Sequence, residues 1–465
     1  MLGYFRINDP YRLLGLLVIM VCISLPLFIH TTPLTHPELK SFVIGEKVRE
    51  GSALYSQLVD STPPLASWLY GAFDFLFGQS LTWRHVFAFL ILFSQSLFFG
   101  IMLIDKKAFA ENTYIPSLVF SLLAFISFDS LALTSDLLAF GFILLALNNL
   151  FKEIEFRIQR DETILNLGIF ISLASLLCFS YTIYLPGVII ILSIFTRNTF
   201  RKYLLMVFGF LLPHAFLLCI HFLMGTTGDL WNYFYLPNLH FSSHSLMDTK
   251  SVLVLCAIPL LYLFVSLFIL NRDARLTKYQ SQIFQAMFLW FIVALVQVFF
   301  AEERRPQSLI PLVPPVGFFL THYLLLIRRR KFAEINLWVL LLGIVAVAYL
   351  ARYNKIPYIH YQQLTVQAPT LPVKNKRILV LDHQPDLFVS NKLAGSFYEW
   401  DVCHSIFEQP EYYENVLLVS RGLGYDLPEV IIDPKNLMEK FFDKLPALKT
   451  KYERSPEGYR LKTNS

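Results

Sequence analysis

The amino-acid sequence predicts an all-α polytopic membrane protein with about eleven transmembrane helices and a small C-terminal extracytoplasmic α/β domain. Of its 465 residues, 55% are hydrophobic and only 16% are charged, and the mean hydropathy is +0.53. These values lie outside the range of ordinary soluble domains. Long apolar runs recur up to residue 351, and polar content rises abruptly from residue 352. We therefore expect a membrane domain over residues 1–351 and a second domain over residues 352–465.

The apolar runs define the expected spans, because a helix needs roughly 20 apolar residues to cross a bilayer. The first run is too long for a signal-peptide core and lacks a small-residue cleavage site, so we expect it to be a retained anchor. We place spans near residues 11–30, 84–104, 113–128, 133–150, 164–179, 182–196, 203–224, 250–270, 281–300, 307–327 and 334–351.

Alternate loops between these spans divide sharply by charge. The basic set is expected to be cytoplasmic by the positive-inside rule, and it includes Arg6, Lys106, Lys152, Arg201, Arg272 and Arg328 to Lys331. We expect the protein in the bacterial inner membrane. This orientation places its N-terminus in the cytoplasm and its C-terminal domain in the periplasm. Because membrane topology explains the basic residues, we expect no nucleic-acid partner. The five cysteines are scattered without metal or disulfide spacing, so we expect no metal and no cofactor.

Two outward segments are longer than the others. The first is the loop 31–83, in which the stretch Pro64 to Phe77 is too short and too mixed to span and is expected to lie in the membrane interface. The second is the tail from residue 352 to 465. Strand-like runs at Arg377 to Leu381, Val416 to Ser420 and Val430 to Ile432 alternate there with a helix-like run, Leu437 to Tyr452. We expect the tail to bind a protein partner.

Glu38 and His36 follow the first span at the outward side. A carboxylate at the edge of the bilayer, where water thins, can have its pKa raised enough to act as a base. The alternative for Glu38 is a structural role as the acidic residue in the first turn of a helix that begins near Pro37. Both interpretations of Glu38 remain open at this level.

Further charged residues are expected at the outward ends of later spans. Asp136 lies at membrane depth, where carboxylates usually mark a site, although helix capping is the alternative. Arg304 and Arg305 run against the positive-inside bias, and guanidinium groups at headgroup level bind phosphate. Internal pairing with Glu302 and Glu303 is the other interpretation, and Arg84 is a candidate of the same kind as the two arginines.

Three stretches resemble the GT-C superfamily of polyprenyl-phosphate-sugar glycosyltransferases, which includes aminoarabinose transferases and protein O-mannosyltransferases. The likeness covers roughly residues 1 to 350. It is carried by Gly51 to Tyr55, Asp60 to Tyr70 and Phe77-Gly78 with Arg84, by Asp136 to Phe142, and by Arg304 to Pro315. In the family an Asp-Glu pair usually opens the first outward loop, whereas this chain has His36-Pro37-Glu38 there.

The resemblance implies a glycosyltransferase that moves a sugar from a polyprenyl-phosphate donor to an envelope acceptor with inversion. Glu38 or Asp60 would deprotonate the acceptor hydroxyl, and Arg305 would offset charge on the departing phosphate. His36, Tyr55, Arg84, Asp136 and Arg304 complete the expected substrate-binding set. The alternative function is a non-catalytic scaffold or lipid-handling component of an envelope assembly complex, which the altered start of the loop favours.

Overall fold

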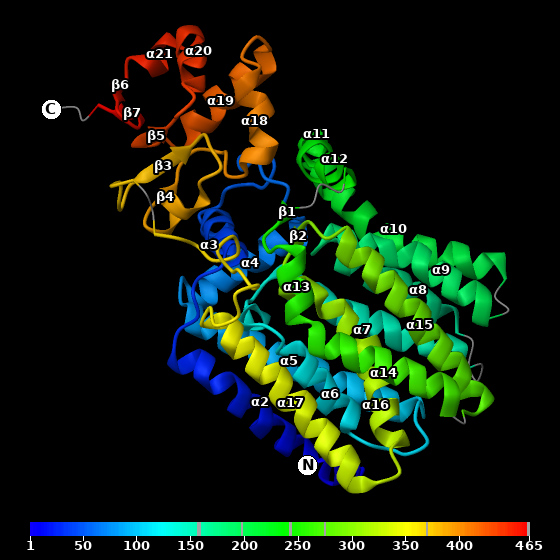
Figure 1. The fold of residues 1–465 in the computed structure, drawn as a ribbon. Coiled ribbons are helices and arrows are strands. Elements are labelled where there is room, and N and C mark those ends of the chain that lie inside the picture. Colours follow the sequence, from blue (N-terminus) through cyan, green and yellow to red (C-terminus); the bar gives the residue numbers. More distant parts are fainter. Residues whose placement is uncertain (156–159, 197–198, 241–243, 274–275, 369–370, 463–465) are drawn as a thin grey trace. The chain divides into compact units, whose positions relative to one another are not determined.

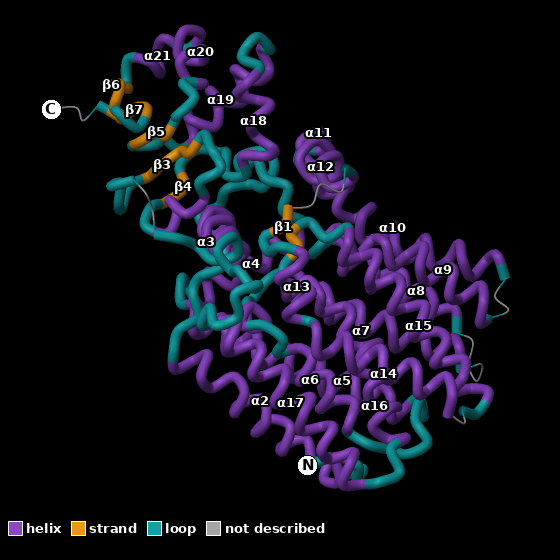
Figure 2. Tube along the Cα trace, in the orientation of Figure 1, coloured by secondary structure: helices purple, strands orange, loops and turns teal. Residues whose placement is uncertain are grey.

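The computed structural model describes residues 1–155, 160–196, 199–240, 244–273, 276–368 and 371–462. Helices dominate these residues, and most strands lie near the C-terminal end (Figure 2). The chain forms two compact units. The helical unit comprises Met1–Pro33, Leu81–Leu217 and Phe241–Leu364, and the loop–tail unit comprises Leu34–Ser80, Leu218–His240 and Thr365–Ser465.

The helical unit is a bundle of long helices joined by short connections (Figure 1). Its first half contains α1 (Leu2–Phe5), α2 (Arg12–Ile29), α5 (Leu81–Asp105), α6 (Ile115–Ala124), η1 (Phe128–Leu131), α7 (Ser135–Ile154), α8 (Asp161–Ser175), η2 (Phe179–Ile183), α9 (Tyr184–Phe195) and most of α10 (Phe200–Leu223). Its second half contains β1 (His244–Ser245), α13 (Thr249–Leu255), α14 (Ala257–Asp273), α15 (Lys278–Phe299), β2 (Glu303–Arg304), η4 (Pro306–Leu312), α16 (Val313–Leu326) and α17 (Arg330–Arg352).

The predicted polytopic membrane fold is confirmed, and each of the eleven predicted spans coincides with a helix or with consecutive helical segments. By length and composition, seven helices of the described residues can cross a membrane, or eight if one bent pair counts as a span. The expected number of eleven is therefore not reached on these criteria. The difference arises because α6 and the η2–α9 segment are apolar but short, and α8 has only 15 residues.

The bent pair is α13 and α14, whose axes meet at 63°. Pro259 lies in the first turn of α14 and cannot donate a backbone hydrogen bond to the carbonyl four residues earlier. Its ring also crowds that carbonyl, at Leu255, where α13 ends. The single span predicted over residues 250–270 is therefore broken by its own proline.

Small residues allow the membrane helices to approach closely. A Cβ atom built on Gly168 of α8 would lie 2.1 Å from the Met206 carbonyl oxygen of α10, and one built on Gly209 would lie 2.3 Å from the Leu165 carbonyl oxygen. The two glycines thus face the opposite backbone reciprocally. This arrangement is typical of membrane helices, whose association depends on close packing.

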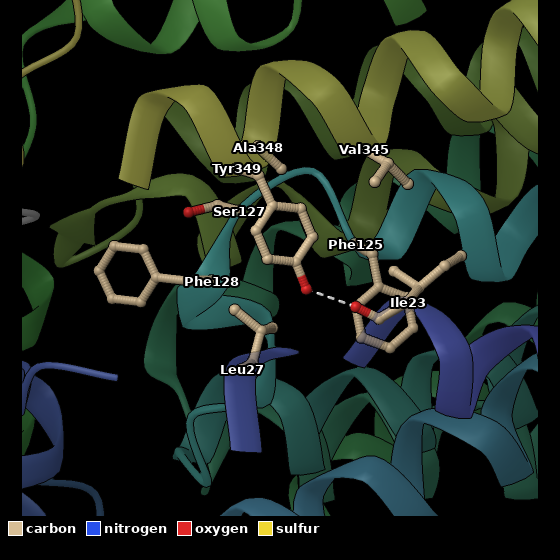
Figure 3. Close-up of a pocket in the computed structure, with 8 residues that line it drawn as sticks. All are labelled: Ile23, Leu27, Phe125, Ser127, Phe128, Val345, Ala348 and Tyr349. Atoms are coloured by element: carbon tan, nitrogen blue, oxygen red, sulfur yellow. Dashed lines mark hydrogen bonds between the residues drawn. The ribbon is translucent and has the colours of Figure 1, made fainter. Parts of the chain in front are cut away.

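A narrow apolar crevice lies among α2, α17 and the turn after α6 (Figure 3). The Tyr349 hydroxyl donates a hydrogen bond of 2.5 Å to the Ile23 carbonyl and joins α17 to α2 there. The crevice has a volume of about 10 Å³, which is about the space of one water molecule. It is therefore a packing feature and not a substrate site.

The loop–tail unit contains a five-stranded sheet with the order β4-β3-β5-β7-β6. Strand β3 pairs in parallel with β4 and β5, and β7 pairs antiparallel with β5 and β6. The elements of this unit are α3 (His36–Arg49), α4 (Pro64–Phe77), α11 (Thr227–Leu230), η3 (Trp231–Tyr235), α12 (Leu236–Leu239), β3 (Arg377–Val380), η5 (Pro385–Val389), β4 (Lys392–Leu393), α18 (Trp400–Glu408), α19 (Tyr413–Tyr425), β5 (Val430–Ile432), α20 (Leu437–Lys444), α21 (Pro446–Lys449), β6 (Tyr452–Ser455) and β7 (Gly458–Leu461).

The predicted α/β character of the tail is confirmed, but the predicted strand Val416 to Ser420 is wrong, because these residues belong to α19. Val416, Val419 and Leu423 are buried at helical spacing against the core of the unit. Burial of this face outweighs the strand preference of the valines. The helix expected over Leu437 to Tyr452 is divided into α20 and α21 and ends before β6.

The compact unit also differs in extent from the domain expected over residues 352–465. Its C-terminal segment begins at Thr365, and the unit also includes the earlier segments 34–80 and 218–240. Helix α3 packs on α4, where a Cβ at Gly45 would lie 2.5 Å from the Tyr70 carbonyl oxygen, and it also packs on η5 and β4. The first outward loop is thus structurally part of the tail unit.

Candidate active site

In the loop–tail unit, the C-terminal part holds the segment that precedes α4. The Val59 amide donates a hydrogen bond to the Ser396 carbonyl, with 2.7 Å between nitrogen and oxygen, and Val59 forms a parallel bridge with Phe397. Pro63 and Pro64 then start α4. Because both ends of the segment are anchored, Asp60 has a defined position between them.

Asp60 is fully buried and its two carboxylate oxygens differ in their contacts. The Thr62 amide donates a 2.7 Å hydrogen bond to Oδ1, and the Lys40 ammonium lies 3.7 Å from the same oxygen. Oδ2 has no hydrogen-bond partner among the described residues. Since a buried acceptor without a donor is costly, Oδ2 is suited to receive a proton or a hydroxyl donor from a substrate.

Glu399 lies beside Asp60 at the N-cap of α18. The backbone amide and the hydroxyl of Ser61 both donate to its Oε2, at 2.9 and 2.6 Å. The Lys40 ammonium lies 3.6 Å from Oε2. Lys40, Asp60 and Glu399 therefore form a triad, in which one ammonium makes ion pairs with two carboxylates.

The environment separates the acidities of the two carboxyl groups. Burial raises the pKa of Asp60 to about 6, with Lys40 opposing this rise and Glu399 adding to it. Burial also acts against the charge of Glu399, but Lys40 and the two hydrogen bonds from Ser61 outweigh it, so the pKa of Glu399 is lowered. Asp60 can thus exchange a proton near neutral pH while Glu399 stays ionised.

Glu38 lies in α3, and its side chain closes a capping box with Thr35. Its Oε2 accepts hydrogen bonds from the Thr35 amide at 3.1 Å and from the Thr35 hydroxyl at 2.8 Å. Glu38 therefore has the structural role at the helix start that the sequence left as an alternative. A catalytic role for Glu38 stays a prediction.

The other residues predicted in the loop are placed as follows. His36 opens α3, with its Nε2 3.7 Å from an Asp386 oxygen. Tyr55 has a left-handed backbone (φ 70°) and is buried against the Phe234 ring, and its hydroxyl donates 2.7 Å to the Thr62 carbonyl. Tyr55 thereby supports the turn that carries Asp60.

In the helical unit, Asp136 and Arg305 form a buried ion pair. Arg305 Nη2 donates a 2.7 Å hydrogen bond to Asp136 Oδ2, and the side chains are 2% and 11% exposed, respectively. Arg305 Nε and Nη1 have no acceptor among the described residues. The guanidinium thus keeps two donor nitrogens, on different edges, each of which can donate to a phosphate oxygen.

A second acidic residue, Asp129, fixes the start of η4, where Arg305 is the N-cap. Asp129 Oδ2 accepts a 2.9 Å hydrogen bond from the Gln307 amide, and the Gln307 side chain bonds to Thr134 and Ala132. The turns that precede α7 and η4 are therefore tied together beside the ion pair. This use of Asp129 is structural.

Two predicted arginines differ in their surroundings. Arg304 is half-buried in β2, and its Cζ lies 6.0 Å from the Phe299 ring centroid. Its Nε has no acceptor in the part of the chain that the structure describes. Arg84 is buried at the start of α5. Both remain predicted substrate-binding residues.

Sequence reasoning missed Lys40 and Glu399. Lys40 lies two residues after Glu38, and an isolated lysine in a polar helix carries no signal of its own. Glu399 lies 338 residues after Ser61, so local spacing could not relate them. In the described residues, no group of three or more His, Cys, Asp or Glu side chains is arranged to hold a metal ion.

An apolar groove of about 490 Å³ runs along the helical unit between α5 and α7. Its walls include Phe87 and Phe98 from α5 and Phe142 from α7, and Gly141 leaves room between them. Gln95 lines the groove and donates a 2.8 Å hydrogen bond to the Leu137 carbonyl. The groove lies on the same helix that carries Asp136 at its start.

Two similar solved structures indicate the class of fold. ArnT from Cupriavidus metallidurans bound to undecaprenyl phosphate has a TM-score of 0.53 and 16% identity, covering 75% of this chain and 66% of that one. The apo state of the same protein has a TM-score of 0.53 and 14% identity, covering 85% of this chain and 88% of that one. The chain is therefore a multi-pass membrane protein with the GT-C fold.

The family follows from the sequence itself. The chain belongs to the family described as a family of unknown function (DUF6427), whose model matches residues 66–357. Among curated proteins we found no match to the sequence.

Proposed function

We propose that this protein transfers a sugar from a polyprenyl-phosphate donor to an acceptor hydroxyl with inversion at the anomeric carbon. The observation that carries the proposal is Asp60, a carboxyl group whose pKa is raised to about 6 by burial and whose Oδ2 has no hydrogen-bond partner within the described ranges. A general base works best when its pKa lies near the operating pH. The GT-C fold and the likeness to a protein bound to undecaprenyl phosphate support the donor class.

In the proposed reaction, the acceptor oxygen bonds to the anomeric carbon while Asp60 takes the proton from that oxygen. The bond from that carbon to the phosphate oxygen breaks, and polyprenyl phosphate leaves as an anion. Arg305 would offset the developing charge with its positive charge and one open donor, Nε or Nη1, while Asp136 fixes the guanidinium through Nη2. The apolar groove between α5 and α7 would accept the prenyl chain.

The test follows consumption of a polyprenyl-phosphate sugar by purified variants. We expect Asp60→Asn to lower kcat by about 10²–10⁴ through loss of the base and Arg305→Ala to lower it by about 10²–10³. Glu38→Gln should remain active, since glutamine also completes a capping box. Exposed Glu453→Gln and Arg201→Ala are the matched controls.

Three outcomes separate the alternatives. Loss of turnover in Glu38→Gln but not in Asp60→Asn would move the base to Glu38. Parent-like turnover in both Asp60→Asn and Arg305→Ala would refute the assignment of these residues. Absence of turnover by the parent with every donor would favour the non-catalytic scaffold, which the structural use of Glu38 also favours.

A further inference from the structure

Glu399, in the C-terminal part of the loop–tail unit, lies beside the proposed base. Its Oε2 accepts both the amide and the hydroxyl hydrogen bonds of Ser61, the residue that follows Asp60. Two donors on one carboxylate oxygen fix the backbone of Ser61 more firmly than one would. Glu399 therefore helps to fix the backbone next to Asp60.

Lys40 connects the two carboxylates electrostatically. Its ammonium is 3.7 Å from Asp60 Oδ1 and 3.6 Å from Glu399 Oε2, so it is almost equally far from both. The side chains of Lys40 and Glu399 are 17% and 18% exposed, and that of Asp60 is 0% exposed. With so little water nearby, screening is weak and each charge acts strongly on Asp60.

The other titratable groups near Asp60 among the described residues carry no charge near neutral pH. They are the Tyr55 hydroxyl in the same loop and the Cys403 thiol of α18, which donates to the Val59 carbonyl at 3.7 Å. Burial raises the pKa of both groups well above its ordinary value. Lys40 and Glu399 are thus the charged residues that act on Asp60.

We propose that Glu399 and Lys40 are positioning residues that set the proton affinity of Asp60 in opposite directions. Lys40 favours the Asp60 carboxylate. Glu399 disfavours it by direct repulsion and by sharing the Lys40 ammonium. The catalytic meaning of this arrangement rests on the proposed function, whereas its effect on the protonation of Asp60 does not.

The effect of the two charges on Asp60 can be tested by the pH dependence of kcat/KM, whose acid limb reports the pKa of the base in the free enzyme. Glu399→Gln keeps an acceptor for Ser61 but removes the charge, so we expect the acid limb to move to lower pH by about one unit. Lys40→Met should move it to higher pH by a similar amount, and Lys40→Arg should return it. Glu408→Gln, an exposed change on the same helix, should leave it in place.

Opposite shifts are the decisive result, because a purely structural defect would lower the rate without moving the limb in two directions. Shifts of the same sign, or an unmoved limb in Glu399→Gln, would overturn the proposal. If Lys40→Met does not fold, the Glu399→Gln shift and its absence in Glu408→Gln still decide the matter.

A second measurement needs no turnover. The Thr62 amide donates to Asp60 Oδ1, and an ionised carboxylate is the stronger acceptor. Hydrogen exchange of peptides that contain Thr62, corrected for the intrinsic pH dependence, should therefore show a protection midpoint that moves in opposite directions in the two variants. If the midpoints move in the two variants but the parent shows no turnover, this inference stands and the proposed glycosyltransferase activity is refuted. An unmoved midpoint would refute the inference alone.

Discussion

At the scale of single residues, two of the Arg–Asp pairs among the described residues have nearly equal lengths but very different surroundings. Arg305 and Asp136 are separated by 2.7 Å and are 2% and 11% exposed. Arg201 and Asp161 are separated by 2.6 Å but are 80% and 48% exposed. The comparison isolates the effect of burial, because distance and chemistry are shared.

Removing one partner of the buried pair should therefore be far more harmful than removing one partner of the exposed pair. We expect Asp136→Ala to cost about 3–5 kcal/mol, since it leaves an arginine charge buried without its carboxylate. Asp161→Ala should cost between about 0 and 1 kcal/mol, because water screens that pair. Thermal unfolding of the purified variants in detergent measures both effects.

A double substitution checks the cause. The Asp136→Asn and Arg305→Leu combination removes both charges and should regain part of the stability lost by either change alone. Costs that simply add would show that the two side chains do not act as a pair.

At the scale of elements, the membrane helices were predictable because lipid imposes a long apolar run on each of them. The residues at the ends of these helices were partly predictable, since the Asp136 and Arg305 charges stand out against an apolar background. Lys40 and Glu399 were not, because polar residues in an exposed-looking loop and tail carry no sign of mutual burial. The α19 residues 416–420 were misassigned because valine-rich composition resembles a strand until its buried partners are known.

The groove between α5 and α7 predicts that KM depends on the length of the donor's prenyl chain. Within 4 Å of a Cβ at Gly141, the described residues place only the Gln95 side-chain nitrogen, at 3.5 Å, which is an ordinary contact. Gly141→Leu should therefore fold and place its side chain in the groove. We expect KM for a long-chain polyprenyl donor to rise about tenfold, which corresponds to the loss of roughly two buried methylene groups.

The matched measurement uses a short-chain donor whose prenyl group ends before Gly141. Its KM should be unchanged in Gly141→Leu, and kcat should be unchanged with both donors. Equal effects on long and short donors would indicate a general distortion of α7 and would remove the groove from the proposed donor site.

At the scale of the whole molecule, the tail has a use within its own chain. Val59 of the first loop and the partly buried Tyr233 belong to the hydrophobic core of the loop–tail unit, and the rest of that core comes from residues after 378. Ion pairs from Lys47 to Asp426 and from Glu46 to Lys392 add to these contacts. The binding of a protein partner, predicted for residues 352–465, would have to use the surface that this packing leaves exposed.

Deletion of residues 365–465 should consequently affect the loop far more than the membrane helices. The truncated chain should still insert, because its long apolar helices are intact. The segment 34–80 should lose its backbone and side-chain anchors, among them the Ser396 carbonyl and the Glu399 carboxylate. We expect it to become sensitive to protease and to exchange its amide hydrogens rapidly, while α5 and α7 stay protected. A loop that remained protected in the truncated chain would show that the tail is a separate domain, with its boundary near residue 352, and that the position of Asp60 does not depend on it.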